Sequence, residues 1–122
     1  MHQSWKPISE HEVQALITRE LLLATREQQS LYARLAVPLE RWTLSPWGDQ
    51  GGGFWVAAVQ NDQVIWYNDI EDGFNVSTFV TRGTIPTNQY WCNQDELGWA
   101  LASLGTDRPR AGPPQPLDEG AA

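Results

Sequence analysis

The sequence predicts an α+β domain with an N-terminal amphipathic helix, an antiparallel meander of three or four strands, and a C-terminal helix packed on the sheet. Two observations carry this prediction. Apolar residues recur at helical spacing near both ends of the chain, and short runs of aromatic and β-branched residues, separated by turn signals, lie between them. Because 122 residues is close to the commonest size for one domain, we expect residues 1–105 to form a single unit.

The first helix begins at a capping-box sequence, in which Ser9 is the N-cap and Glu12 stands three positions later. Apolar residues then follow at spacings of three and four, until Pro38 bars continuation. A straight helix over residues 10–36 would be about 40 Å long, which is more than a small domain is wide. We therefore expect a bend at residues 28–30, or an overhang through which two copies form a homodimer.

Three strands are expected next, over residues 54–60, 63–69 and 74–81. The Asn61-Asp62 link suits a tight hairpin turn because both residue types tolerate positive φ, and Gly73 is the expected left-handed residue of the following turn. Residues 84–90 are a candidate fourth strand, which Pro86 would confine to an edge. In the second strand, both sets of alternating residues, one for each face of the sheet, include large apolar side chains. This pattern leaves open whether its second face is covered by the N-terminal helix or exposes aromatic side chains.

A second capping-box sequence precedes the C-terminal helix, with Asn93 as N-cap and Glu96 at the third helical position. Cys92 and Leu97 then occupy the two positions of a hydrophobic staple, and Gly105 suits the end of the helix. One face of this helix is expected to be buried, namely Leu97, Ala100, Leu101 and Leu104.

Residues 106–122 are expected to form a disordered, proline-rich tail. They hold four of the eight prolines, and Leu117 is their one large aliphatic residue. Such a segment buries too little apolar area to offset the entropy of ordering.

The charge balance excludes some classes of partner. Fifteen acidic residues against eight basic ones give a net charge of −7, and a nucleic-acid backbone would be repelled by that field. The single cysteine, Cys92, allows no internal disulfide, which favours a cytoplasmic location. The densest apolar run, residues 21–24, is far too short to span a bilayer, so we expect no membrane association.

Three carboxylates lie within four positions of the second turn, at Asp69, Glu71 and Asp72. Clustered loop oxygens suit Ca²⁺ or Mg²⁺, but the spacing does not match an EF-hand loop. A pair of them could also act as general acid and base, although that chemistry needs two groups facing each other across a substrate. We therefore favour a solvated turn and expect no metal, no cofactor and no catalytic residue.

The remaining candidate sites have ordinary structural explanations. The glycine triplet 51–53 lacks the Lys-Ser/Thr and the helix that a phosphate-binding loop needs, so it is expected to be a flexible connector. His2 and His11 have no partners at a spacing typical of a triad or zinc site. Cys92 could be an activated thiol at a helix N-terminus, but a packed thiol is the favoured interpretation.

Aromatic residues are the most informative feature for function, because tryptophan and tyrosine are enriched at interfaces. Seven tryptophans are many for a chain of this size, and we expect most aromatics to be core and one or two to be exposed beside the acidic turn. The predicted binding residues are Trp66, Asp69, Glu71, Asp72 and Trp91.

The function favoured by these features is a non-enzymatic acidic binding or regulatory protein that engages a protein partner, in particular a basic one. A protein that neutralises a toxin, as in bacterial toxin–immunity pairs, is one form of this idea. Two alternatives remain open. One is a small-molecule or metal-dependent enzyme with a site near the acidic turn, and the other is a structural subunit that dimerises through the N-terminal helix.

Overall fold

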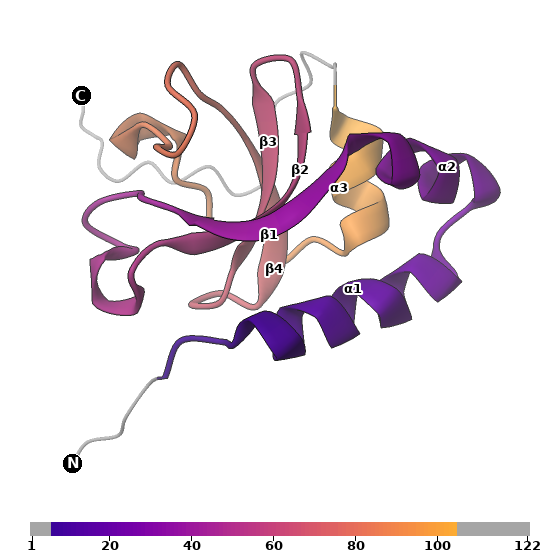
Figure 1. Ribbon diagram of the computed structural model, residues 1–122, viewed down its shortest axis with the longest axis horizontal. Coiled ribbons are helices and arrows are strands. Elements are labelled where there is room, and N and C mark those ends of the chain that lie inside the picture. The colour runs from indigo at the N-terminus through magenta and orange to yellow at the C-terminus, as the bar shows by residue number, and fades with distance from the viewer. Residues whose placement is uncertain (1–5, 105–122) are drawn as a thin grey trace.

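The computed structural model describes residues 6–104, which form helices on one side of a four-stranded antiparallel sheet (Figure 1). The strands lie in the order β1-β2-β3-β4, each paired with its neighbour in sequence. The α+β prediction is therefore confirmed, while Gly105 and the predicted tail lie outside the described residues. The elements in chain order are α1 (Glu10–Leu23), α2 (Arg26–Leu35), β1 (Ala36–Trp42), β2 (Phe54–Gln60), β3 (Gln63–Asn68), β4 (Gly73–Thr78) and α3 (Leu97–Ser103), with short 3₁₀ turns at Asp49–Gly51 and Thr87–Gln89.

The long N-terminal helix of the sequence analysis is two helices, and the break lies earlier than residues 28–30. Ser9 caps α1 as predicted, with both hydrogen bonds of a capping box. Thr25 forms a second capping box with Gln28, in which the Thr25 hydroxyl accepts the Gln28 N–H at 3.1 Å. The Thr25 N–H in turn donates to the side-chain oxygen Oε1 of Gln28 at 3.0 Å. Apolar spacing continues through this cap, which is why periodicity alone missed it.

The fourth strand is residues 36–42, and the prediction of a strand at residues 84–90 was wrong. β1 is an edge strand. Proline has no N–H group to donate, and at the edge of the sheet the missing donor at Pro38 removes no hydrogen bond between strands that the sheet needs. Thr84 makes only one isolated bridge, to Thr43, and residues 87–89 form a 3₁₀ turn. Pro38 marks the end of helix in the sequence pattern, but it is also permitted at a sheet edge.

Both faces of the sheet are buried, one by helices and the other by loops. Alternation along β3 sends Ile65 and Tyr67 to the helix side, and Val64 and Trp66 to the loop side. The helix-side core consists mainly of Val13, Ile17, Ile65, Tyr67, Phe74, Val76, Leu97, Ala100 and Leu101. The loop-side core consists of Trp42, Leu44, Phe54, Val56, Val64, Trp66, Ile85 and Tyr90. The second face is thus neither exposed nor covered by the N-terminal helix, because residues 43–53, between β1 and β2, and residues 79–92, between β4 and α3, cover it.

The turn between β3 and β4 uses its glycine differently from the prediction. Asp72 is the left-handed residue, with φ of 61°, whereas Gly73 begins β4. A Cβ added at Gly73 would stand 2.3 Å from the Gln94 Cα, so a side chain is excluded by close backbone contact. Glycine is needed here for the space that it leaves free.

Residues 91–95 run along the free edge of β4 and hold the start of α3. The Phe74 N–H donates to the Asp95 carbonyl at 2.8 Å, and the Asn75 side chain pairs with the backbone of Asn93 through bonds of 3.1 and 3.2 Å. Asn93 is therefore buried in this contact and is not the N-cap. The N-cap is Glu96, with no side-chain cap of its own, and the predicted Cys92–Leu97 staple was wrong because α3 begins later than expected.

We predict that Gly73→Ala destabilises the fold by about 1–3 kcal/mol, because its Cβ would overlap the 93–94 backbone. Gly98→Ala is the matched control. Its Cβ would meet the end of the Gln28 side chain, whose Oε1 accepts the Thr25 N–H, but no backbone, and alanine gains up to about 1 kcal/mol in a helix, so the net loss should be smaller than at Gly73. Urea unfolding of both variants measures the difference, and similar midpoints would show that the β4 contact is not tight.

A second prediction concerns the helix-side core. Leu101→Ala should cost about 2–5 kcal/mol, because Leu101 is fully buried and a cavity would remain. The same substitution at Leu22, which is 77% exposed, should change stability by less than about 0.5 kcal/mol. Denaturant titration gives the loss in the free energy of unfolding for both variants. Equal losses would mean that Leu101 of α3 is not part of the core.

Candidate functional site

A groove opens among the helices, and its lining residues come from α1, α2, α3 and the residues that cap them. Its volume is about 350 Å³. It combines apolar and acidic side chains, and its lining is Glu20, Leu23, Ala24, Gln28, Glu96, Gly98, Trp99 and Ala102.

Local sequence explains why these residues meet. The Thr25 capping box turns the chain between α1 and α2 and fixes the Gln28 side chain. The absence of a side chain at Gly98 lets α3 approach, since a Cβ there would be 2.9 Å from the Gln28 Oε1. Glu20 accepts a hydrogen bond from the Leu97 N–H, which joins the end of α1 to the first turn of α3. The turn between α1 and α2 and the contact between α1 and α3 thus meet at this groove.

The groove carries the most exposed tryptophan of the described chain. Trp99 is 59% exposed, whereas Trp42 and Trp66 are fully buried. Leu22 and Leu23, at the end of α1, are 77% and 80% exposed. Large apolar side chains that gather on a surface beside polar ones are typical of binding sites.

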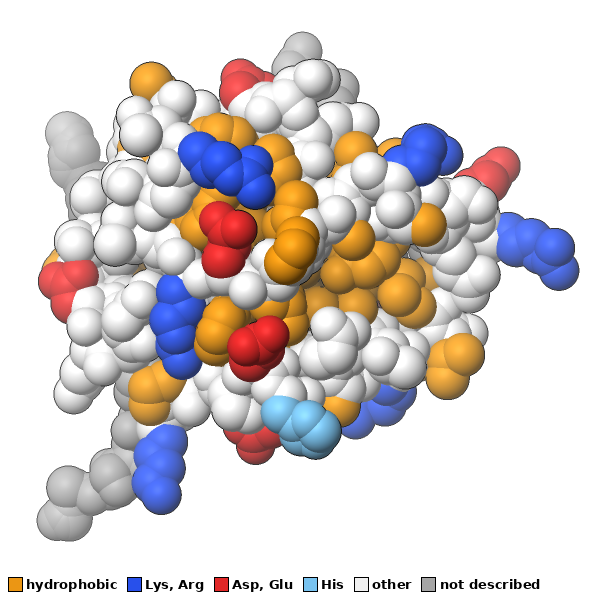
Figure 2. All heavy atoms as spheres, in the orientation of Figure 1, with side chains coloured by type: hydrophobic (Ala, Val, Ile, Leu, Met, Phe, Trp, Pro, Cys, Tyr) orange, Lys and Arg blue, Asp and Glu red, His pale blue; other side chains and the backbone are white. Residues whose placement is uncertain are grey.

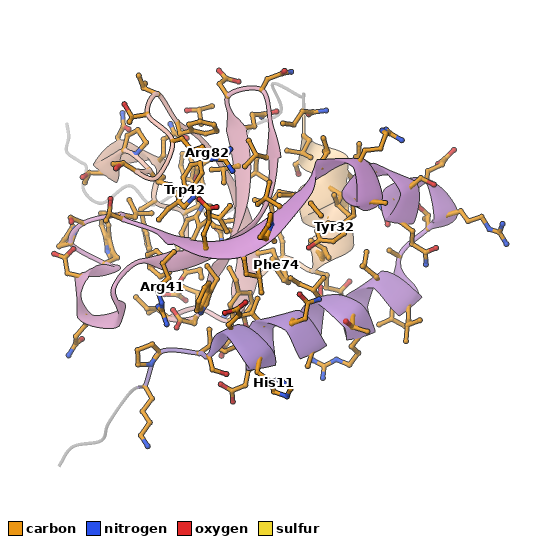
Figure 3. All side chains as sticks on the ribbon, viewed as in Figure 1. His11, Tyr32, Arg41, Trp42, Phe74 and Arg82 are labelled. Carbon is orange, nitrogen blue, oxygen red and sulfur yellow. The ribbon has the colours of Figure 1, made fainter. Side chains whose placement is uncertain are left out.

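A second apolar region lies in the seam between β1 and α1, where Figure 2 shows hydrophobic side chains gathered in the middle of one face. Tyr32 lies in this seam (Figure 3). Its side chain and those of Leu16, Leu35 and Leu39 are half-buried and packed against the helix-side core. Burial raises the pKa of Tyr32. Because these residues already pack against the helix-side core, the seam is an outer layer of that core, and the groove is the stronger candidate site.

The predicted binding residues divide between the surface and the interior. Trp66 is fully buried and donates to the Ser77 hydroxyl at 2.9 Å, so it presents no surface to a partner. Trp91 is half-buried, and its Nε1 has no hydrogen-bond partner among the described residues. Asp72 is exposed, while Asp69 and Glu71 are partly so.

The acidic turn has a structural role. The Asp69 carboxylate accepts the Ile8 N–H at 2.8 Å and thereby holds the segment that leads into α1. Burial raises the pKa of Asp69, against the opposing effects of the Ile8 hydrogen bond and of Arg41. The Asn68 side chain accepts the N–H groups of Ile70 and Glu71 and closes the turn.

The negative charges of three carboxylates act on the Tyr67 hydroxyl. Burial, followed by the charges of Asp72, Glu20 and Asp69, raises the pKa of Tyr67 to about 12, and a hydrogen bond with the Asp72 side chain adds to this. Glu20 also lines the groove. Glu20 is therefore the residue that the groove has in common with the acidic groups acting on Tyr67.

Two arginines at the β1 side are held by aromatic rings. The Arg41 guanidinium lies 4.3 Å from the centroid of Trp55 and donates to the Gly51 carbonyl. Arg82 lies 5.6 Å from the centroid of Trp42, and its guanidinium is 3.9 Å from the Glu40 carboxylate (Figure 3). These cations face β1 and its loops, away from the groove.

The other candidates of the sequence analysis remain ordinary. His11 is exposed on α1, and His2 lies outside the described residues. Cys92 is partly buried and packs against the loop-side core. The glycine segment leads into β2, as predicted, and the Gly53 N–H donates to the Gly48 carbonyl at 2.8 Å. That this connector is flexible stays a prediction.

Sequence reasoning missed Trp99, although a signal was present. Trp99 lies two positions after Leu97 and two before Leu101, about 200° around the helix from each at 100° per residue. The apolar stripe of α3 therefore faces away from it. A tryptophan opposite a buried stripe is an exposed tryptophan unless another element covers it.

We predict that Tyr67 makes stability depend on alkaline pH. Its folded-state pKa of about 12 lies above the unfolded value of about 10. The stability that the protonated Tyr67 hydroxyl contributes to the folded state is therefore complete below about pH 10 and is lost as the pH rises towards 12. The full loss in the free energy of unfolding is about 3 kcal/mol. Urea titrations at pH 9, 10 and 11 should show a steeper fall for the wild type than for Tyr67→Phe. Parallel curves would contradict a buried, ionisable Tyr67 hydroxyl.

Residues 6–104 contain neither a metal-binding cluster nor a membrane-spanning helix. No three His, Cys, Asp or Glu side chains in this range are placed to hold a metal ion. No helix in this range has the length and apolar composition needed to cross a membrane. The chain as a whole matches no protein-family model, no curated protein and no solved structure.

Proposed function

We propose that this protein is a small, non-enzymatic binding or regulatory protein that engages a basic protein partner through the groove between α1, α2 and α3. The observation that carries the proposal is the exposed Trp99, together with the exposed Leu23, in a groove also lined by the carboxylates of Glu20 and Glu96. Tryptophan anchors surrounded by polar residues are the usual centres of binding energy at interfaces.

Charge supports a basic partner. The chain carries a net charge of −7, and the groove shares Glu20 with the carboxylates of Asp69 and Asp72 around Tyr67. A field of one sign speeds the encounter with a partner of the opposite sign and repels unsuitable ones. Neutralising a basic toxin, as an immunity protein does, is one form that this function would take.

The prediction is that Trp99→Ala weakens partner binding about thirtyfold or more, which corresponds to the loss of a hot spot of about 2 kcal/mol. The full chain, immobilised, would capture the partner from the native source, and surface plasmon resonance with the purified partner would then give the affinities. Val80→Ala is the control, since Val80 is an exposed apolar residue that does not line the groove.

The charge component is tested with the same assay. Glu96→Lys should slow association at low salt, and the effect should shrink as salt rises, because steering is screened over about 10 Å at 0.1 M. Glu10→Lys, at the opposite end of α1, is the control with the same change in charge. The proposal fails if the Trp99 and Val80 variants bind alike, or if association is independent of the sign at residue 96.

A further inference from the structure

The groove between α1, α2 and α3 brings carboxylates and an aromatic ring together without a cation. Its lining includes Glu20, Glu96 and Trp99, and none of its described lining residues is lysine or arginine. Trp99 is 59% exposed, and Glu96 is exposed as well. A negatively charged groove with an open indole ring is complementary to a cation that can also stack on that ring.

The two groove residues at the start of α3 are placed to act together. Glu96 is the N-cap of α3 and Trp99 is at the third helical position, the pair of positions whose side chains come together in a capping box. Glu96 makes no side-chain cap hydrogen bond. Its carboxylate is therefore not used to cap the helix that it begins, and it shares the groove with the tryptophan.

Glu20 supplies a second carboxylate from the facing helix. Its Oε1 accepts the Leu97 N–H, so that the side chain is held next to the first turn of α3. A carboxylate has two oxygens and about four lone pairs, and this one hydrogen bond leaves it acceptor capacity. Because Glu20 is half-buried, salt screens its charge less than that of an exposed carboxylate.

A complete arrangement of this kind already occurs elsewhere in the molecule. The Arg82 guanidinium lies 5.6 Å from the centroid of Trp42 and 3.9 Å from the Glu40 carboxylate, so one cation contacts a tryptophan and a glutamate (Figure 3). Arg41 over Trp55 is a related pair at 4.3 Å, in which backbone carbonyls accept the guanidinium N–H groups. The groove has the tryptophan and the glutamate of this arrangement, and its described lining lacks the arginine.

The groove favours a guanidinium over an ammonium group. A guanidinium is planar, so its face can stack on an indole while its N–H groups, which lie in the plane, donate to carboxylates beside the ring. The lysine ammonium is a compact, strongly hydrated charge without a flat face. The groove volume of about 350 Å³ is at the small end of the range for ligand sites, about 300–1,000 Å³, and suits an inserted side chain.

We propose that the groove is a receptor for an arginine side chain of the basic partner, with the guanidinium stacked on Trp99 and its N–H groups donating to Glu96 and Glu20. The inference rests on the proposed function in taking this groove as the docking site, and it names the group that the partner inserts. Leu23 and Ala102, which also line the groove, would cover the aliphatic part of the arginine side chain. The inserted arginine would be a hot spot of the interface, since tryptophan and arginine are both enriched at such positions.

The test uses the full chain and three short peptides. Each is Ala-X-Ala with blocked ends, in which X is arginine, lysine or citrulline, and citrulline has nearly the shape of arginine without its charge. Nuclear magnetic resonance follows their titration at constant ionic strength, with the Trp99 indole signal assigned by its absence in Trp99→Phe. We expect the arginine peptide to move this signal saturably, with a dissociation constant of about 10 mM. The lysine peptide should bind at least about threefold more weakly, and the citrulline peptide should leave the signal in place.

Two variants and one control assign the contacts. Glu96→Gln keeps the size of the side chain and removes its charge, and it should weaken binding of the arginine peptide at least about threefold. Glu10→Gln, at the start of α1, makes the same change at another exposed glutamate and should leave the affinity unchanged. In Trp99→Ala the amide signal of Ala102 serves as the readout, and it should no longer respond to the peptide.

Binding that is selective for arginine and depends on both Trp99 and Glu96 supports the inference. Equal affinity for the lysine and arginine peptides overturns it, and so does a Trp99 signal that none of the peptides moves. Failure of the proposed function gives a different result, in which a captured partner binds the Trp99→Ala and wild-type chains alike. If that partner's binding depends on Trp99 but excess arginine peptide competes no better than the citrulline peptide, the docking site stands and arginine as its occupant is overturned.

Discussion

The structure depends on one close backbone contact, between the start of β4 and residues 93–95. Gly73 leaves no side chain at the point where the 93–94 backbone passes, and Phe74 and Asn75 then hold that segment by hydrogen bonds. This contact completes the outer edge of the sheet, whose N–H and C=O groups would otherwise be open to another chain. It also sets the direction from which the chain enters α3.

The groove follows from where α3 is placed. Once the 93–95 segment is fixed, Leu97 reaches the carboxylate of Glu20, and Gly98 comes against the side chain of Gln28. Leu97, Ala100 and Leu101 are then buried on the sheet, and the opposite side of α3 is left outside. Trp99 is exposed for this geometric reason, because the helix has one stripe to bury and Trp99 is not part of it.

Local patterns in the sequence predicted elements better than they predicted contacts. The capping box at Ser9 and the hairpin between β2 and β3 depend on residues close in the chain, and both were recoverable. Asn93 has the same local signature as Ser9, but a distant residue, Asn75, pairs with its backbone and removes it from the helix. Pairing of that kind depends on the tertiary fold, which local spacing does not encode. β1 was missed for the related reason that Pro38 marks both a helix end and an edge strand.

The acidic residues show the same limit at the candidate site. Clustering in sequence drew attention to the turn at Asp69, yet Asp69 holds Ile8, and Glu20, far away in sequence, holds Leu97. Two of the three carboxylates whose charges act on Tyr67 therefore accept hydrogen bonds from the backbone at or just before the start of a helix. Because those carboxylates still contribute their charge to the surface field, one set of residues both fixes the fold and makes the region acidic. Specific contact would then depend on the apolar side chains that the fold leaves uncovered, of which Trp99 is the largest.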